Sequence, residues 1–460
     1  MSTIRFSIKV KALDCYIYAG RLFLILQEGN LVCCSYDKII DYLKEKYPDL
    51  KPLITLAFQQ CSYLNSDAAK AILGVKEVMD ALHRVWDYAA NTIDFSIDYK
   101  DILGKGSFGI VYKGISHKDN KEEPVALKQI PKEIANDRNK LQLLSNEVVI
   151  SANLFDDEDK NEDGKSRMKN IVSFLDIIKI DNNGYLVYEF CNGGDLKRYM
   201  RYIKNFDENM IQNILRQILI GLDRLHNKKI VHHDIKPENI LVELRLPEGD
   251  DSNLEETIKE VMETTDPKNR NGKKMDKDRL LNILNSSIMK LSDFGLSKEI
   301  KSYNKKEVSG SPLYIDPYLF NKNVNNEDIN NEKVDIWALG VVAYEMFFND
   351  LPFLPFPPKL DKLKNLLDIG EYPIDMKKCQ KISKQFLSFL NMCLQRPQKI
   401  RPLADELLQC EFITREPEYF TYLTIDNYRN EEFPDDSYLK KDGQITMNID
   451  DNRMINATFE

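Results

Sequence analysis

A short stretch at residues 230–240 contains the side chains best suited to chemistry. It places Asp234, Lys236 and Asn239 close together between apolar flanks. A carboxylate that can take a proton, an ammonium group and a metal-binding amide are the parts that phosphoryl transfer needs, because that reaction depends on positioning and charge stabilisation. Taken alone, the stretch also fits a surface turn capped by Asp and Asn. The motifs that accompany it decide between the two interpretations.

A glycine-rich run lies upstream at residues 103–111 and reads LGKGSFGIV. Its glycines are Gly104, Gly106 and Gly109. Glycine lets backbone amides approach phosphate groups without a Cβ in the way. The same spacing occurs in dinucleotide folds, but there a helix follows, whereas here Val111 begins a β-like run. The run therefore favours a loop that covers phosphates.

Together these motifs resemble the protein kinase family. Residues 230–240 resemble its catalytic loop, and residues 125–128, VALK, resemble its lysine-bearing strand. The metal-binding DFG motif is matched at residues 293–295. The resemblance covers residues 97–413, and it implies an α+β bilobal fold with a β-rich small lobe and a helical large lobe.

The resemblance also implies ATP and Mg²⁺ as cofactors and assigns a role to each matching residue. The catalytic set is Asp234, Lys236, Lys128 and Glu147. The nucleotide set is Gly104, Gly106, Ser107, Gly109, Val111, Ala126, Lys128, Tyr188, Glu189 and Cys191. The magnesium ligands are Asn239 and Asp293. Asp234 would orient or deprotonate the substrate hydroxyl, and Glu147 would pair with Lys128.

Two further segments match the large lobe of the family. Residues 310–317 resemble the segment that seats the substrate, which implies that Ser311 lies beside Asp234 and Lys236. Residues 335–340 resemble the start of a core helix whose aspartate braces the catalytic loop. The apolar run that continues to residue 348 is shorter than the ~20 residues of a membrane span. We expect a buried helix and no membrane span.

Two departures from the family concern its phosphate switch. His233 stands where the family usually has the arginine that pairs with a phosphorylated loop, and Glu307 stands where the family often has the phosphorylated threonine. A fixed carboxylate thus replaces the phosphate, and a protonated His233 could face it. We predict activity that does not depend on phosphorylation at this position.

A third departure affects an internal ion pair. The family motif A-P-E is Asp316-Pro317-Tyr318 here, so the glutamate that pairs with the large-lobe arginine is absent. Arg401 then needs another partner, because an unpaired buried charge costs about 3–5 kcal/mol. Asp316 is our candidate.

The loop pattern around Lys236 resembles serine/threonine kinases, so the expected partners are protein substrates phosphorylated on serine or threonine. Asp195, Glu238 and Glu345 match an acidic recess that binds arginine upstream of the target in some kinases, although they could equally be ordinary surface acids. The alternative function is a catalytically weak pseudokinase that acts as a scaffold through residues 1–96. A small-molecule kinase is disfavoured by the substrate-seating segment. The hinge sequence at residues 189–196 is faintly similar to autophagy-initiating kinases.

Three parts are expected along the chain. Residues 1–96 show no kinase pattern and read as an additional β-then-α module, which packs on the small lobe or binds a regulatory protein. Residues 97–413 form the kinase domain, and residues 414–460 form an acidic, disordered tail. Polar composition marks insertions at about 156–166 and 243–279, and we expect the second to be largely disordered with a short helix near residues 254–262.

Composition limits the remaining possibilities. The formal net charge of −9 gives no sign of a nucleic-acid or anionic-membrane surface, so we expect neither partner. The 8 cysteines show no metal-ligand spacing and suit free thiols in a reducing compartment. We expect a cytoplasmic protein, with a nuclear location left open.

Overall fold

The computed structural model describes most residues between 95 and 419 and short segments outside that range. The described residues are 12–18, 21–26, 31–35, 95–106, 109–117, 121–130, 147, 150–151, 154, 169–180, 183–204, 206–269, 274–299, 310–311, 313–316, 332–352, 371–375, 381–395, 398–419, 422–424, 445–449 and 454–459. The chain divides into two compact units, which are described separately. Unit 1 comprises residues 1–168 and 172–190, and unit 2 comprises residues 169–171 and 191–460.

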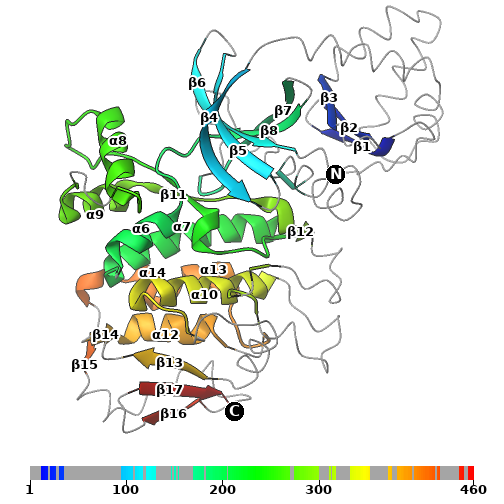
Figure 1. The fold of residues 1–460 in the computed structure, drawn as a ribbon. Helices are drawn as coiled ribbons and strands as arrows, with labels where there is room; N and C mark the ends of the chain where they lie inside the picture. Colours follow the sequence, from blue (N-terminus) through cyan, green and yellow to red (C-terminus); the bar gives the residue numbers. More distant parts are fainter. Residues whose placement is uncertain are drawn as a thin grey trace, which may run out of the picture. The chain divides into compact units, whose positions relative to one another are not determined.

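A five-stranded antiparallel sheet forms the centre of unit 1, with the strand order β4-β5-β6-β8-β7 (Figure 1). Its strands are β4 (Phe95–Gly106), β5 (Gly109–Ser116), β6 (Glu123–Gln129), β7 (Phe174–Ile180) and β8 (Asn183–Glu189). Alternate residues of β5 and β6 are buried, as the period of two in a strand requires. The core on one face contains Phe95, Tyr112, Val125, Leu127, Tyr185 and Val187. The other face is left for Lys128 and the residues that pair with it.

One buried helical face also belongs to unit 1. Glu147, Ile150, Ser151 and Leu154 are helical, and each is at most 2% exposed. Their spacing of three and four residues places them on one side of a helix. The expected insertion at 156–166 lies outside the described residues.

Three N-terminal strands form a separate antiparallel sheet in the order β1-β2-β3. They are β1 (Ala12–Tyr18), β2 (Arg21–Leu26) and β3 (Leu31–Ser35). Consecutive pairing makes this sheet a meander, which agrees with the β-rich first part of the predicted β-then-α module. The helical half of the predicted N-terminal module lies outside the described residues.

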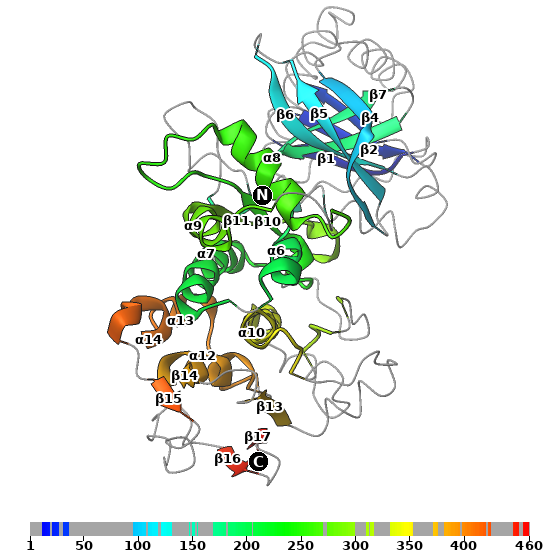
Figure 2. The ribbon, with the colours of Figure 1, turned by 60° about the vertical axis from the view of Figure 1, so that its left-hand side comes forward.

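Helices dominate unit 2 (Figure 2). They are α6 (Leu196–Ile203), α7 (Glu208–Asn227), α8 (Leu254–Thr265), α9 (Lys277–Ser286), α10 (Glu332–Phe348), α12 (Lys384–Cys393), α13 (Ala404–Leu408) and α14 (Glu411–Thr414). Side chains of Asp195 and Asp207 cap the first turns of α6 and α7. α10 is apolar on nearly all sides and lies against α7 and α12, as a central core helix must. In the described parts of the chain, no helix is both long and apolar enough to span a membrane.

The insertion after the catalytic loop is ordered at residues 243–269 and 274–279, so the prediction of a largely disordered segment was wrong. The short helix predicted near residues 254–262 is confirmed as α8. Within the predicted insertion at 243–279, α8 is a full helix and α9 begins, and α8 contacts α6 (Figures 1 and 2). Its buried residues are Thr257, Val261, Thr264 and Thr265. Three of these four are threonines, which count as polar, so the amino-acid composition does not reveal the buried side of the helix. Arg198 of α6 donates to the Met262 carbonyl oxygen at 3.1 Å and fixes α8 in place.

Short elements complete unit 2. They are β9 (Ile230–Val231), η4 (Pro237–Asn239), β10 (Ile240–Glu243), β11 (Ile288–Leu291), η5 (Phe294–Leu296), β12 (Lys298–Glu299), β13 (Glu371–Asp375), β14 (Lys381–Ser383), η9 (Pro417–Tyr419), β15 (Tyr422–Thr424), β16 (Ile445–Ile449) and β17 (Met454–Phe459). Strand β15 pairs with β14, and β17 pairs with β13 and β16. The sequence predicted no regular structure beyond residue 413, and the structure differs from it in these strands.

Candidate active site

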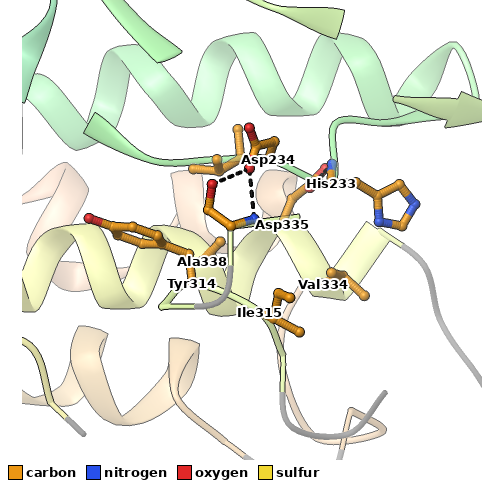
Figure 3. Close-up of a pocket in the computed structure, with 9 residues that line it drawn as sticks. His233, Asp234, Tyr314, Ile315, Val334, Asp335 and Ala338 are labelled. Carbon is orange, nitrogen blue, oxygen red and sulfur yellow. Dashed lines mark hydrogen bonds between the residues drawn. The ribbon is translucent and has the colours of Figure 1, made fainter. Parts of the chain in front are cut away.

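Asp234 lies in the loop between β9 and η4 (Figure 3). Both of its carboxylate oxygens accept hydrogen bonds. Its Oδ1 accepts from the backbone nitrogen (2.9 Å) and the hydroxyl (2.8 Å) of Ser311. Its Oδ2 accepts from Lys236 Nζ at 2.6 Å and from the Asn239 amide nitrogen at 2.9 Å. Lys236 also donates to the Ser311 hydroxyl at 2.7 Å. Asp234 is thereby held in one orientation, with a hydroxyl and an ammonium group beside it.

Asp335, in the first turn of α10, accepts hydrogen bonds from the backbone of the same loop. Its Oδ1 accepts from the backbone nitrogen of His233 and its Oδ2 from that of His232, both at 2.8 Å. Nε2 of His226, in the last turn of α7, lies 3.0 Å from Oδ2. Burial by itself would raise the pKa of Asp335, but the hydrogen bond from His226 and the neighbouring histidines lower this pKa overall. A buried carboxylate therefore fixes the loop backbone, as the sequence predicted.

His233 has a left-handed backbone with φ of 64°, which is uncommon for a residue with a Cβ. Gly310 packs against it: φ there is 127°, and a Cβ on Gly310 would lie 2.7 Å from the His233 carbonyl oxygen. The imidazole points away from the Asp234 carboxylate (Figure 3). A small cavity of about 10 Å³ beside this loop has room for no more than one water molecule. The predicted partner of His233, Glu307, lies outside the described residues.

The predicted magnesium ligands, Asn239 and Asp293, lie at one end of a two-stranded ladder. Ile240 at the start of β10 pairs with Leu291 at the end of β11. The backbone nitrogen (2.9 Å) and hydroxyl (3.0 Å) of Ser292 both donate to the Asn239 carbonyl oxygen. Asp293 is the next residue, so these bonds hold it close to Asn239. The insertion joins the opposite end of the ladder and leaves this end intact.

The chemistry of these two side chains fits Mg²⁺. Both hydrogen bonds of the Asn239 amide nitrogen go to Asp234, which leaves the amide oxygen to act as a ligand. Asp293 is half-buried and adopts a left-handed backbone conformation with φ of 64°. Residues other than glycine rarely adopt this conformation, and it is often found at functional sites. A carboxylate and an amide oxygen are hard ligands of the kind that Mg²⁺ prefers.

In unit 1, Lys128 and Glu147 form the predicted ion pair. Lys128 Nζ lies 2.6 Å from Glu147 Oε1, and the two side chains are 12% and 3% exposed. Strand register places Val111 opposite Lys128 and Ala126 opposite Tyr188. Residues paired across neighbouring strands share a face of the sheet. Three of the predicted nucleotide residues, Val111, Ala126 and Tyr188, therefore lie on the same face of the sheet as Lys128.

The glycine-rich run is a hairpin between β4 and β5. Gly104 pairs with Val111, and Gly106 pairs with Gly109, whose φ of 131° favours glycine. A Cβ on Gly104 would have open space around it. Ser107 of the predicted nucleotide set lies outside the described residues.

The predicted hinge follows β8. The Glu189 side chain accepts from the Ser173 backbone nitrogen at 2.6 Å, so it is engaged within its own unit. Cys191 begins the unit 2 part of the chain and is 8% exposed. The family resemblance implies that both positions bind adenine through backbone groups, and this role stays a prediction.

The predicted acidic recess is partly occupied by the protein itself. Lys197 Nζ forms an ion pair with Glu345 Oε1, and the Tyr314 hydroxyl donates to Glu345 Oε2 at 2.7 Å. Burial raises the pKa of Asp195, and the charge of Glu238 adds to this shift. Of the three acids, Glu238 is the exposed one. Nothing in the sequence indicated that Lys197 would reach Glu345, because these residues are 148 positions apart.

Arg401 has the partner that the sequence suggested. Its Nη1 lies 2.6 Å from Asp316 Oδ2 and its Nη2 lies 3.2 Å from Oδ1, and both side chains are fully buried. Gln398 donates to the same Oδ2 at 2.7 Å. A two-pronged contact of this kind is the strongest geometry for a carboxylate and a guanidinium. Asp316 thus replaces the missing glutamate, while Tyr318 lies outside the described residues.

Sequence reasoning missed two contributors to the site. His226 holds Asp335, and its only signal was a polar residue in the last turn of an apolar helix. Ser292 ties Asp293 to Asn239. It directly precedes the DFG motif, but its contact depends on the pairing of β10 with β11.

The protein kinase domain model matches residues 97–413. Similar proteins include serine/threonine-protein kinase ULK1 of Homo sapiens, which is 28% identical over 70% of this chain and 26% of its own length. Serine/threonine-protein kinase pakH of Dictyostelium discoideum is 29% identical over 69% of this chain and 50% of its own length. Serine/threonine-protein kinase ATG1 of Kluyveromyces lactis is 26% identical over 57% of this chain and 30% of its own length. The chain thus spans a quarter to a half of these relatives, and by the extent of the family match it belongs to the protein kinase domain family.

Proposed function

We propose that this protein transfers the γ-phosphoryl group of ATP to serine or threonine hydroxyls of protein substrates. One observation carries the proposal. Asp234 already accepts a hydrogen bond from a serine hydroxyl at 2.8 Å, and Lys236 contacts both that oxygen and the carboxylate. A substrate hydroxyl needs the same surroundings, namely a carboxylate that accepts its proton and a cation that stabilises charge at the oxygen.

Each residue contributes positioning or charge. Asp234 orients the substrate hydroxyl and accepts its proton, while Lys236 stabilises negative charge on the transferred group. Asn239 and Asp293 hold magnesium through oxygen ligands. Lys128, paired with Glu147, contacts phosphate oxygens, and the glycine hairpin covers them with backbone amides. When bound, Mg-ATP supplies the phosphoryl group and the metal charge that offsets its phosphates.

The scaffold alternative is not favoured. Similar proteins are serine/threonine-protein kinases, and the residues that bind phosphate and metal in the family are all present in this chain. Two departures from the family, the altered A-P-E motif and His233, favour a scaffold. The first carries less weight here, because Asp316 pairs with Arg401.

Phosphate transfer from radiolabelled Mg-ATP to a basic protein tests the proposal. Wild type, Asp234→Asn and Asp405→Asn should be compared after phosphatase treatment. Loss of a positioned base typically lowers rates about 10²–10⁴-fold, so Asp234→Asn should lose nearly all transfer. Asp405 is exposed on α13, and its variant should behave as wild type. Equal transfer by wild type and Asp234→Asn would refute the proposal.

We further propose a preference for basic residues upstream of the target, carried mainly by Glu238 and Asp195. Glu345 contributes less, because Lys197 already neutralises it. A peptide library in which Glu238→Gln loses the preference for Arg and Lys would support this. A wild-type protein with no such preference would rule it out.

A further inference from the structure

A single oxygen of Glu147 receives two donors from different strands. Lys128 Nζ lies 2.6 Å and the Tyr188 hydroxyl 2.8 Å from Glu147 Oε1. Glu147 is 2% exposed, so these donors replace the water that a free carboxylate would bind. The Lys128 contact is the expected one. The Tyr188 contact is not part of the catalytic roles proposed for Lys128 and Glu147.

The sheet itself aims Tyr188 at Glu147. Tyr188 pairs with Ala126, two residues before Lys128 on β6, and therefore shares the face of Lys128. The small Ala126 side chain leaves room for a tyrosine ring beside it. Phe174 of β7 makes an edge contact with that ring, with centroids 5.5 Å apart and planes at 64°. The ring is thus held from one side, and its hydroxyl is directed to the carboxylate.

Lys128 and Tyr188 share the carboxylate, so the position of Glu147 does not depend on the ammonium group alone. A neutral phenol holds Glu147 without adding a competing positive charge. Because Glu147 begins the buried helical face that includes Ile150 and Leu154, the hydroxyl also fixes that helix against the sheet.

We propose that Tyr188 is a positioning residue for phosphoryl transfer, whose hydroxyl holds Glu147 against Lys128. The inference rests on the proposed kinase function and adds a third member to its ion pair. Tyr188 acts through Glu147 and does not itself contact the reacting atoms.

Removing one oxygen atom tests this inference. Tyr188→Phe keeps the ring and its contact with Phe174, whereas Tyr185→Phe removes a buried hydroxyl from the opposite, core face of the same strand. A hydrogen bond to a charged group corresponds to a factor of at least about ten, so kcat should fall about tenfold in Tyr188→Phe. We expect less than about a twofold change in KM for ATP. Tyr185→Phe should retain the wild-type kcat.

A second background shows whether Tyr188 acts through Glu147. In Glu147→Ala, the further change Tyr188→Phe should leave the residual rate unaltered, because the two residues form one unit. An equal loss in both backgrounds, or a Tyr188→Phe enzyme within about twofold of wild type, would overturn the proposal.

Amide hydrogen exchange gives a readout that needs no catalysis. The segment 147–154 should exchange up to about tenfold faster in Tyr188→Phe and at the wild-type rate in Tyr185→Phe. A wild-type protein without transfer activity would refute the proposed function. Equal exchange in wild type and Tyr188→Phe would instead refute Tyr188 as the residue that holds Glu147.

Discussion

Replacing Asp316 by alanine should destabilise unit 2 severely, because it strands a charge in the interior. The Arg401 guanidinium is fully buried and loses both prongs of its contact with Asp316. Gln398 loses an acceptor at the same time. Removing one partner of a buried ion pair typically costs about 3–5 kcal/mol.

The remaining contacts of Arg401 place the loss at the lower end of that range. Its Nε (3.0 Å) and Nη2 (2.6 Å) donate to the Gln395 carbonyl oxygen, and its Nη1 donates to that of Lys333 at 2.5 Å. The guanidinium carbon also lies 5.2 Å from the centre of the Trp337 ring. Because these groups still interact with the guanidinium, we expect the free energy of unfolding to fall by about 3 kcal/mol. That loss is a large part of the ~5–15 kcal/mol by which a folded domain is typically stable.

Urea unfolding followed by tryptophan fluorescence measures this loss, since Trp337 lies against Arg401. Glu416→Ala is the matched control, because it removes an exposed carboxylate and should change stability by less than about 0.5 kcal/mol. The double variant Asp316→Leu/Arg401→Met should recover much of the loss, because apolar replacements of a buried pair are often neutral. A loss below about 1 kcal/mol in Asp316→Ala would refute the reasoning. So would a double variant whose loss equals the sum of the losses from the two single changes, Asp316→Leu and Arg401→Met.

Three further outcomes are expected. Burial raises the pKa of Asp335, but the contact with His226 and the neighbouring histidines together lower it more, so the pKa is lower in the folded protein than in the unfolded chain. The stabilisation by the Asp335 carboxylate should therefore be complete above the pKa of the unfolded chain, near pH 4, and should be lost as the pH falls through the folded pKa. The difference in unfolding free energy between wild type and Asp335→Asn should accordingly shrink below about pH 4, and a constant difference would contradict this. Arg198→Ala should loosen the insertion at a cost of about 1 kcal/mol, seen as faster proteolysis of residues 254–286 with transfer activity retained. Phosphatase-treated protein should transfer phosphate as fast as untreated protein, because Glu307 supplies a fixed negative charge, and recovery of a lost rate by rephosphorylation of the loop would disprove it.

The reactive residues could be predicted from the sequence because their spacing is local. Asp234, Lys236 and Asn239 lie within one turn, and the structure joins them directly. Contacts between distant segments were much harder to predict. Asp316 was found only because a missing glutamate left Arg401 without a partner, and Lys197 was missed because no comparable gap pointed to it.

The ordered insertion was mispredicted for a different reason. Composition measures the average polarity of a segment, but a helix needs only one stripe of its surface to be buried. In α8 that stripe contains Thr257, Val261 and Thr264, and threonine counts as polar although its methyl group packs well. Met275 adds to the buried set from the segment that leads into α9. The prediction of disorder therefore failed at a position where polar residues carry the packing.

Because β10 pairs with β11, the length of the chain between these strands does not affect the positions of Asn239 and Asp293. This pairing brings residues 240 and 291 together whatever is linked to the far end between residues 243 and 288. Closing a longer loop costs only about 0.6 kcal/mol for each doubling of its length. The connection between these strands, which holds α8 and α9, can therefore accept a foreign sequence, such as a fluorescent reporter or an affinity tag, more readily than other positions near the metal ligands. For the same reason, this connection is where lineages of such enzymes can gain or lose whole segments without rebuilding the chemistry.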